Sequence, residues 1–183
     1  MKKKNVLILG GNSKNNIAWI HKVRKVFTRD YKVNEICYDH WKNNNEINFD
    51  VELKKLEKIT HDIKDYYIVS KSIGSIIALI GIEKQIINPK GIVILGFPLK
   101  YLQKINLNIK QLLNNVINET EILVIQQKND PIGKCEEVIK ELPANIRVIE
   151  IPGNHHVYSN MNSIKPLVDQ FFKNKTTLSH YKV

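Results

Sequence analysis

Residues 66–75 read Tyr66-Tyr67-Ile68-Val69-Ser70-Lys71-Ser72-Ile73-Gly74-Ser75, and the apolar run Ile76–Ile82 follows at once. The bulky apolar residues 66–69 predict a short buried strand. The segment Ile73–Ile87 is almost wholly apolar, which predicts a buried helix that begins directly after the strand. A buried strand that turns so sharply into a buried helix is typical of a parallel sheet covered by helices. This stretch therefore decides the fold class.

Strand and helix patterns alternate along the rest of the chain. The predicted strands are Asn5–Leu9, Lys32–Tyr38, Tyr66–Val69, Gly91–Leu95, Ile122–Ile125 and Arg147–Ile151. The predicted helices are Ile17–Phe27, Val51–Ile63, Ile73–Ile87, Ile105–Ile117, Pro131–Leu142 and Ser163–Phe172. This order predicts one α/β domain over residues 1–183, a three-layer sandwich around a mostly parallel sheet of about six strands. Ligand sites in such sheets lie beyond the carboxyl ends of the strands.

Composition is that of an ordinary soluble domain. Hydrophobic residues make up 43% of the 183 residues and charged residues 25%, so neither disorder nor a fibrous class is indicated. The apolar runs are too short to span a bilayer, and Val6–Leu9 after the first lysines is too short for a secretion signal. Cys37 and Cys135 lie far apart and are expected to be free thiols. We therefore expect a cytoplasmic monomer or homodimer with no membrane partner.

The formal net charge of +10 raises the question of a nucleic-acid partner. The lysines are spread along the whole chain, and neither an arginine-rich segment nor zinc-finger spacing is present. Nucleic acid is therefore not expected to be the main partner.

Ser72 stands at the predicted strand-to-helix turn. The segment Ser70-Lys71-Ser72-Ile73-Gly74 fits the nucleophile elbow G-x-S-x-G, with a serine in place of the first glycine. Small residues are needed there because strand and helix approach closely. The alternative is a serine-rich cap of the helix, which is common.

Two other predicted strands also end in polar residues. Asp130 follows the strand Ile122–Ile125, either as a carboxylate that orients a histidine or as a capping residue. His155 and His156 follow the last strand in a glycine-containing loop. Adjacent histidines rarely point the same way, and no carboxylate or cysteine has suitable local spacing, so a metal site is not expected.

The order Ser…Asp…His, each after a different strand, resembles the α/β-hydrolases, and in particular small lidless members related to dienelactone hydrolase. The motifs that carry the resemblance are Leu9-Gly10-Gly11-Asn12, Ser70-Lys71-Ser72-Ile73-Gly74, Gly96-Phe97-Pro98, Asn129-Asp130-Pro131 and Gly153-Asn154-His155-His156. They span nearly the whole chain. The resemblance departs at the first elbow glycine and at the His-Gly common after the first strand, which reads Gly10-Gly11 here.

The resemblance implies a serine hydrolase that cleaves an ester, thioester or related acyl bond of a small substrate, with no metal or other cofactor. Ser72 would be the nucleophile, His156 its base in preference to His155, and Asp130 the carboxylate that orients the base. The backbone amides of Ile73 and Asn12 would bind the oxyanion, with Gly11 as the alternative to Asn12.

Gly11, Phe97 and Tyr158 are expected to line the substrate site together with Leu99, although the larger side chains could equally belong to the core. Short loops predict an open, shallow site that suits short acyl esters, thioesters or a peptide-like surface, and not long buried lipids. One rival is a non-catalytic binding protein on the same scaffold. A second is a flavodoxin-like nucleotide binder, which the Gly10-Gly11-Asn12-Ser13 turn suggests but the glycine spacing does not support.

Overall fold

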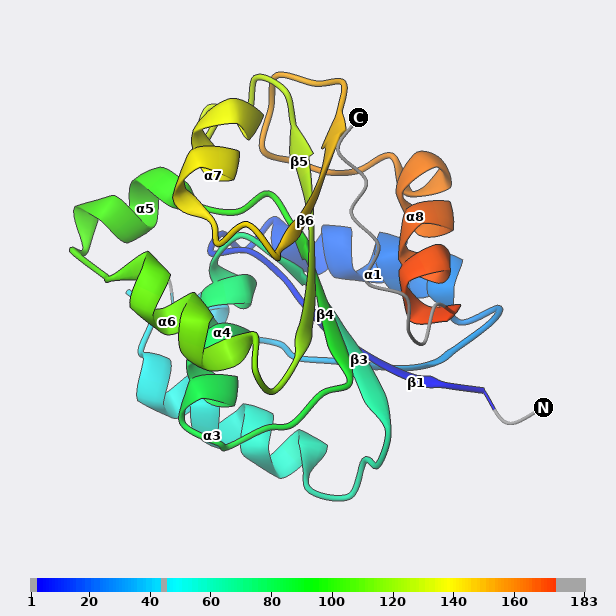
Figure 1. The fold of residues 1–183 in the computed structure, drawn as a ribbon. Helices are drawn as coiled ribbons and strands as arrows, with labels where there is room; N and C mark the ends of the chain where they lie inside the picture. Colours follow the sequence, from blue (N-terminus) through cyan, green and yellow to red (C-terminus); the bar gives the residue numbers. More distant parts are fainter. Residues whose placement is uncertain (1–2, 44–45, 174–183) are drawn as a thin grey trace.

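The computed structural model describes residues 3–43 and 46–173 of the chain. Within these residues, six strands form a single sheet in the order β2-β1-β3-β4-β5-β6, with every neighbouring pair parallel (Figure 1). The strands are β1 (Asn5–Leu9), β2 (Lys32–Glu35), β3 (Tyr66–Lys71), β4 (Gly91–Leu95), β5 (Glu121–Gln127) and β6 (Arg147–Ile151). The predicted fold class, an α/β sandwich on a parallel sheet, is therefore confirmed.

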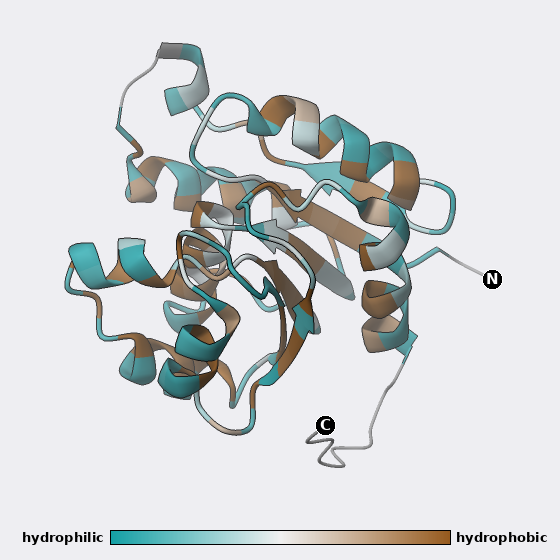
Figure 2. Ribbon diagram, turned by 90° about the horizontal axis from the view of Figure 1, so that it is seen from above, coloured by the Kyte–Doolittle hydropathy of each residue, from teal (hydrophilic) through white to brown (hydrophobic). Residues whose placement is uncertain are grey.

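Helices cover both faces of the sheet. They are α1 (Asn16–Phe27), α2 (His40–Asn43), α3 (Phe49–Thr60), α4 (Ile73–Glu83), α5 (Leu99–Lys104), α6 (Ile109–Val116), α7 (Cys135–Glu141) and α8 (Met161–Lys173). Helices α1 and α8 lie together on one face, and α3, α4 and α6 lie on the other (Figure 1). The helices turn apolar residues toward the sheet (Figure 2), and α4 is apolar and buried along almost its whole length because α3 and α6 also pack on it. The sheet is thus the middle layer of three.

The central strands are continuously apolar because they are buried on both faces. Every residue of β3 and β4 is buried, whereas the edge strands β2 and β6 are partly exposed. At the end of β3, neighbouring side chains point to opposite faces of the sheet. Ser70 contacts Ser75 on α4, whereas Lys71 donates to Asn16 on α1. The end of β3 is therefore tied to both helical layers.

The predicted strand Lys32–Tyr38 ends at Glu35, and two predicted helices also differ from the structure. Instead of one helix over Ile105–Ile117 there are two, α5 and α6, because Asn106 has a positive φ of 53° and the Asn108 side chain caps α6. Helix α7 begins at Cys135 and not at Pro131, because residues 130–133 form a turn closed by the Gly133 amide on the Asp130 carbonyl. The two helix differences lie in the chain segments that follow β4 and β5.

Strand β1 lies between β2 and β3, so the connection from β1 to β2 runs toward one edge of the sheet and the later strands are added toward the other edge. The loops that leave β1 and β3 therefore start side by side at the carboxyl edge, the position where open α/β sheets place their ligands. In the described part of the chain, no helix combines the length and apolarity needed to cross a membrane.

Candidate active site

Ser72 occupies a strained turn between β3 and α4. Its backbone has φ 52° and ψ −120°, a conformation that costs a non-glycine residue on the order of 1–3 kcal/mol. The Ser72 amide donates to the Leu95 carbonyl at 3.3 Å, which fixes the turn to the neighbouring strand β4. A strained serine at this junction is the geometry of a nucleophile elbow and not that of an ordinary helix cap, since the Ser72 side chain caps nothing in α4.

The small residues on either side of Ser72 are explained by close contacts. A Cβ atom on Gly74 would lie 2.5 Å from the Gly10 carbonyl oxygen, so only glycine fits there. Ser70 is fully buried, and its hydroxyl donates to the Val93 carbonyl at 3.1 Å and lies 3.0 Å from the Ser75 hydroxyl. A serine can therefore replace the first elbow glycine without leaving a buried hydroxyl unsatisfied.

Asp130 and His156 form an ion pair at the same edge of the sheet. The His156 Nδ1 atom lies 2.7 Å from Asp130 Oδ2 and 2.9 Å from Oδ1. Asp130 is fully buried, and it also accepts hydrogen bonds from the Ile132 amide at 2.8 Å and the Tyr158 hydroxyl at 2.7 Å. The carboxylate is thus held by three groups. It closes a turn with Ile132 and orients His156, but it does not cap a helix, because α7 begins only at Cys135 with Lys134 as its N-cap.

The other ring nitrogen of His156, Nε2, is the atom that would act as the base. Among the described residues, nothing hydrogen-bonds to His156 Nε2, although the atom is buried. The ring lies against Gly96, where an added Cβ would stand 2.8 Å from His156 Cε1. Because Lys71 pairs with Leu95 in the sheet register, Ser72 lies beside Gly96. Ser72 and His156 thus both lie next to Gly96 at the end of β4, and no hydrogen bond joins these two residues.

His155 has a different environment. Its amide donates to Gln127 Oε1 at 3.0 Å, its ring Nδ1 lies 3.2 Å from Gln127 Nε2, and the side chain is exposed. Gln127 lies at the end of β5 and so anchors the loop that carries both histidines. The structure pairs Asp130 with His156 and not with His155.

The loop after β1 lies directly against the elbow, because the Gly10 carbonyl contacts Gly74. Its direction is fixed by residues that follow β2. The Asn12 carbonyl lies 2.8 Å from His40 Nε2 and accepts from Trp41 Nε1 at 2.9 Å, and Tyr38 donates to the Gly10 carbonyl at 3.2 Å.

Ile73 is the first residue of α4, where a backbone amide has no acceptor within the helix. The expected oxyanion donors, Ile73 and Asn12, therefore come from two adjacent segments.

The sequence profile described as "Alpha/beta hydrolase domain" matches residues 42–177 of the chain, about three quarters of its length. The chain belongs to this α/β-hydrolase family. No curated protein sequence matches the chain significantly.

Several solved structures share the fold of this chain at low sequence identity. The ydeN gene product of B. subtilis has 15% identity and a TM-score of 0.70, covering 93% of this chain and 100% of that one. Naproxen esterase (carboxylesterase NP) of Bacillus subtilis has 12% identity and a TM-score of 0.68, covering 94% and 84%. Est1E of Butyrivibrio proteoclasticus, solved with ferulic acid, has 14% identity and a TM-score of 0.70, covering 93% and 88%. These likenesses concern the fold.

The residues expected to line the substrate site of this α/β-hydrolase are mostly buried. Phe97 and Tyr158 are each 1% exposed and Leu99 is 3% exposed, so these side chains belong to the core, the alternative that the sequence had left equally open. Tyr158 contributes to the site through Asp130 and also accepts from the Gln127 amide at 2.9 Å. Burial raises the pKa of the Tyr158 phenol well above its ordinary value, so it remains a neutral donor. Gly11 is also buried, in the loop beside the elbow.

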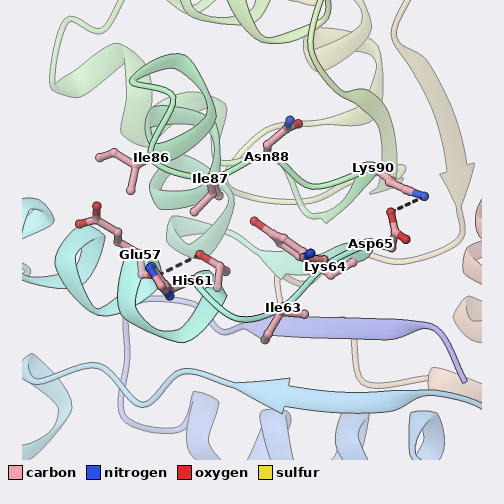
Figure 3. Close-up of a pocket in the computed structure, with 11 residues that line it drawn as sticks. Glu57, His61, Ile63, Lys64, Asp65, Ile86, Ile87, Asn88 and Lys90 are labelled. Carbon is pink, nitrogen blue, oxygen red and sulfur yellow. Dashed lines mark hydrogen bonds and ion pairs between the residues drawn. The ribbon is translucent and has the colours of Figure 1, made fainter.

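A hollow of about 590 Å³ lies away from these residues, at the amino ends of β3 and β4 (Figure 3). Its lining includes Tyr66, which begins β3, and the ion pair between Lys90 and Asp65 at 2.6 Å. Ser72 lies beyond the opposite end of β3, so this hollow is not the place of the proposed chemistry. No cluster of three potential metal-ligating side chains occurs in residues 3–43 and 46–173.

Proposed function

We propose that this protein is a serine hydrolase that cleaves a carboxylic ester, thioester or related acyl bond of a small substrate. The observation that carries the proposal is the strained Ser72 turn at the same sheet edge as the Asp130–His156 ion pair. The family supports a hydrolase, and two structures of similar fold are described as naproxen esterase (carboxylesterase NP) and as Est1E with ferulic acid bound.

In the proposed first half-reaction, His156 Nε2 removes the proton of the Ser72 hydroxyl while Ser72 Oγ attacks the acyl carbon. The carbonyl oxygen becomes an oxyanion that accepts hydrogen bonds from the Ile73 amide and from the amide of Asn12 or Gly11. His156 then gives the proton to the leaving alcohol or thiol, which departs and leaves an acyl-enzyme. Water repeats the sequence on the acyl-enzyme and releases the acid.

Asp130 supports both halves by fixing the ring of His156 and by stabilising its protonated form. Its full burial and its hydrogen bonds from Tyr158 and Ile132 keep the carboxylate in one place. The amino end of α4 adds a favourable field for the oxyanion beside Ile73. We infer a substrate with a short acyl group. The segment between β4 and β5 forms α5 and α6, and α6 packs on α4, so this segment belongs to the helical layer and does not form a lid that would enclose a long acyl chain.

The test is hydrolysis of p-nitrophenyl acetate by the wild type and by Ser72→Ala, together with labelling by a fluorophosphonate probe. Loss of the nucleophile lowers kcat by at least about 10³-fold and abolishes labelling, while the circular dichroism spectrum is unchanged. Ser163→Ala is the matched control because that hydroxyl is exposed on α8 and donates only to the Asn160 carbonyl. Equal rates for Ser72→Ala and the wild type would overturn the proposal.

A further inference from the structure

Lys71, the residue before the proposed nucleophile, is a buried cation. Its side chain is 8% exposed, its Nζ atom donates to Asn16 Oδ1 at 3.0 Å, and it lies 5.9 Å from the centre of the Trp19 ring. Lysine rarely occurs at such burial without a carboxylate partner. Among the described residues it forms no ion pair, and its hydrogen-bonded partner is a neutral amide.

Asn16 connects this lysine to the loop after β1. Its side chain is 5% exposed, and its Nδ2 atom donates to the Ser13 carbonyl at 2.8 Å and to the Ser13 hydroxyl at 3.2 Å. The orientation of the Asn16 amide is therefore fixed, because its oxygen accepts from Lys71 and its nitrogen donates to Ser13. The loop backbone packs on the same amide, since a Cβ on Gly11 would lie 3.0 Å from both its Oδ1 and Nδ2 atoms.

We propose that Lys71 is a positioning residue that, through Asn16, holds the loop after β1 at a fixed distance from the elbow and so places the second oxyanion donor. This inference rests on the proposed hydrolase function. It follows from the path of hydrogen bonds: one oxyanion donor is the amide of Ile73, two residues after Lys71, and the other lies in residues 11–12. The bridge Lys71–Asn16–Ser13 links these two segments through side chains.

The contacts of His40 and Trp41 with the Asn12 carbonyl cannot replace this bridge. They tie the loop to the segment that follows β2, at the other side of β1 from the elbow. They fix the direction of the loop, whereas the Lys71–Asn16 bridge ties the loop to the strand that carries the nucleophile.

A charged lysine gives this bridge more strength than a neutral donor would, because hydrogen bonds from ionised donors are about twice as strong as neutral ones. The groups that face the ammonium are the Asn16 amide and Trp19 ring on α1 and, at longer range, the Asp130 carboxylate after β5. Burial lowers the pKa of Lys71 to about 8, against the opposing effect of Asp130. The bridge therefore weakens as the lysine loses its proton in mildly alkaline solution.

The experiment compares Lys71→Met, Asn16→Ala and the double variant with p-nitrophenyl acetate. Each single variant lowers kcat by about tenfold or more with KM within about twofold, since the donor is displaced and not removed. The double variant is no slower than the slower single variant, because both changes break one bridge. Lys165→Met is the matched control: Lys165 also lies over aromatic rings and has acidic partners, but on α8 against Phe27 and Tyr31.

The pH profile supplies a readout that a purely structural lysine would not move. The wild-type kcat/KM declines above about pH 8 to a lower plateau, because the neutral amine still donates a weaker hydrogen bond. Lys71→Met shows no decline in that range, and Lys71→Arg, which stays charged, keeps its rate there. An unchanged alkaline decline in Lys71→Met, or additive losses in the double variant, would overturn the inference.

Hydrogen–deuterium exchange separates this inference from the proposed function, since it needs no activity. Amides of residues 10–13 exchange faster in Lys71→Met and Asn16→Ala than in the wild type and Lys165→Met. If Ser72→Ala kept full activity, the hydrolase proposal would fail while the exchange result still tested the bridge. Unchanged exchange in both bridge variants would reject the bridge whatever the substrate.

Discussion

Gly96→Ala is a test of how closely the proposed base is positioned. Gly96 has φ +71° and lies between the end of β4 and the ring of His156. The added methyl group would stand 2.5 Å from Tyr158 Cε2 and 2.8 Å from His156 Cε1. To reach 3.4 Å, where ordinary van der Waals contact begins, the tyrosine ring must move by about 0.9 Å and the histidine ring by about 0.6 Å.

These shifts set the expected magnitudes. A displacement approaching 1 Å in a reacting group costs on the order of 10²-fold in rate, so kcat falls by about 100-fold. The positive φ costs alanine about 1–2 kcal/mol, and the overpacking adds about 1–3 kcal/mol, so the variant unfolds more easily but stays folded at 25 °C. Both effects come from one methyl group.

The assay is steady-state hydrolysis of p-nitrophenyl acetate together with urea denaturation followed by circular dichroism. Gly81→Ala is the matched control, because Gly81 is also buried, lies within α4, and the atoms nearest to its added Cβ would be side-chain atoms of Ile87 and Leu56 at 3.2–3.3 Å. A folded Gly96→Ala variant with kcat within about threefold of the wild type would refute the placement of His156 over Gly96.

Three other predictions concern stability. Tyr158→Phe lowers the free energy of unfolding by about 3 kcal/mol in urea denaturation, because the buried Gln127 amide loses its acceptor and a buried carboxylate loses a donor; a loss below about 0.5 kcal/mol would contradict this. Gly74→Ala does not fold, since its Cβ would strike the Gly10 carbonyl oxygen at 2.5 Å, and a soluble variant with the wild-type Tm would show the approach to be looser. For Lys71, burial places the pKa in the folded chain at about 8, below the ordinary value of 10.5, so the folded chain releases the proton at a lower pH than the unfolded chain does. As the pH rises from 8 to 10.5, the wild type therefore gains up to about 3 kcal/mol in its free energy of unfolding relative to Lys71→Met. Parallel stabilities of the two proteins over this range would contradict the burial of the charge.

The strands could be predicted because their burial on both faces leaves an uninterrupted apolar run in the sequence. Asn5–Leu9, Gly91–Leu95 and Arg147–Ile151 have the predicted bounds. The break between α5 and α6 was missed because it depends on Asn106 adopting a positive φ, for which the sequence offers only a weak preference. The capping side chain of Asn108 was a readable signal of the second helix.

The proposed catalytic residues could be selected because each follows a strand, and parallel strands end at one edge. The roles of the supporting residues could not be predicted, although Tyr158 was expected at the site as a lining residue, since these roles come from contacts between distant parts of the chain. Asn16 matters because Lys71 of β3 donates to it on the α1 face of the sheet, and Tyr158 matters because its hydroxyl donates to Asp130. Neither side chain belongs to a local pattern that the sequence displays.

The serine at position 70 has a consequence for finding related chains. Glycine is obligatory where a Cβ would strike backbone, as at Gly74, but at position 70 a hydroxymethyl group fits between the Val93 carbonyl and the Ser75 hydroxyl. The two serines, five residues apart, form a matched pair across the strand–helix junction. A sequence pattern that requires glycine on both sides of the proposed nucleophile therefore does not match this chain. The pattern Ser-x-Ser-x-Gly-Ser after an apolar strand would identify other chains in which serine replaces the first glycine.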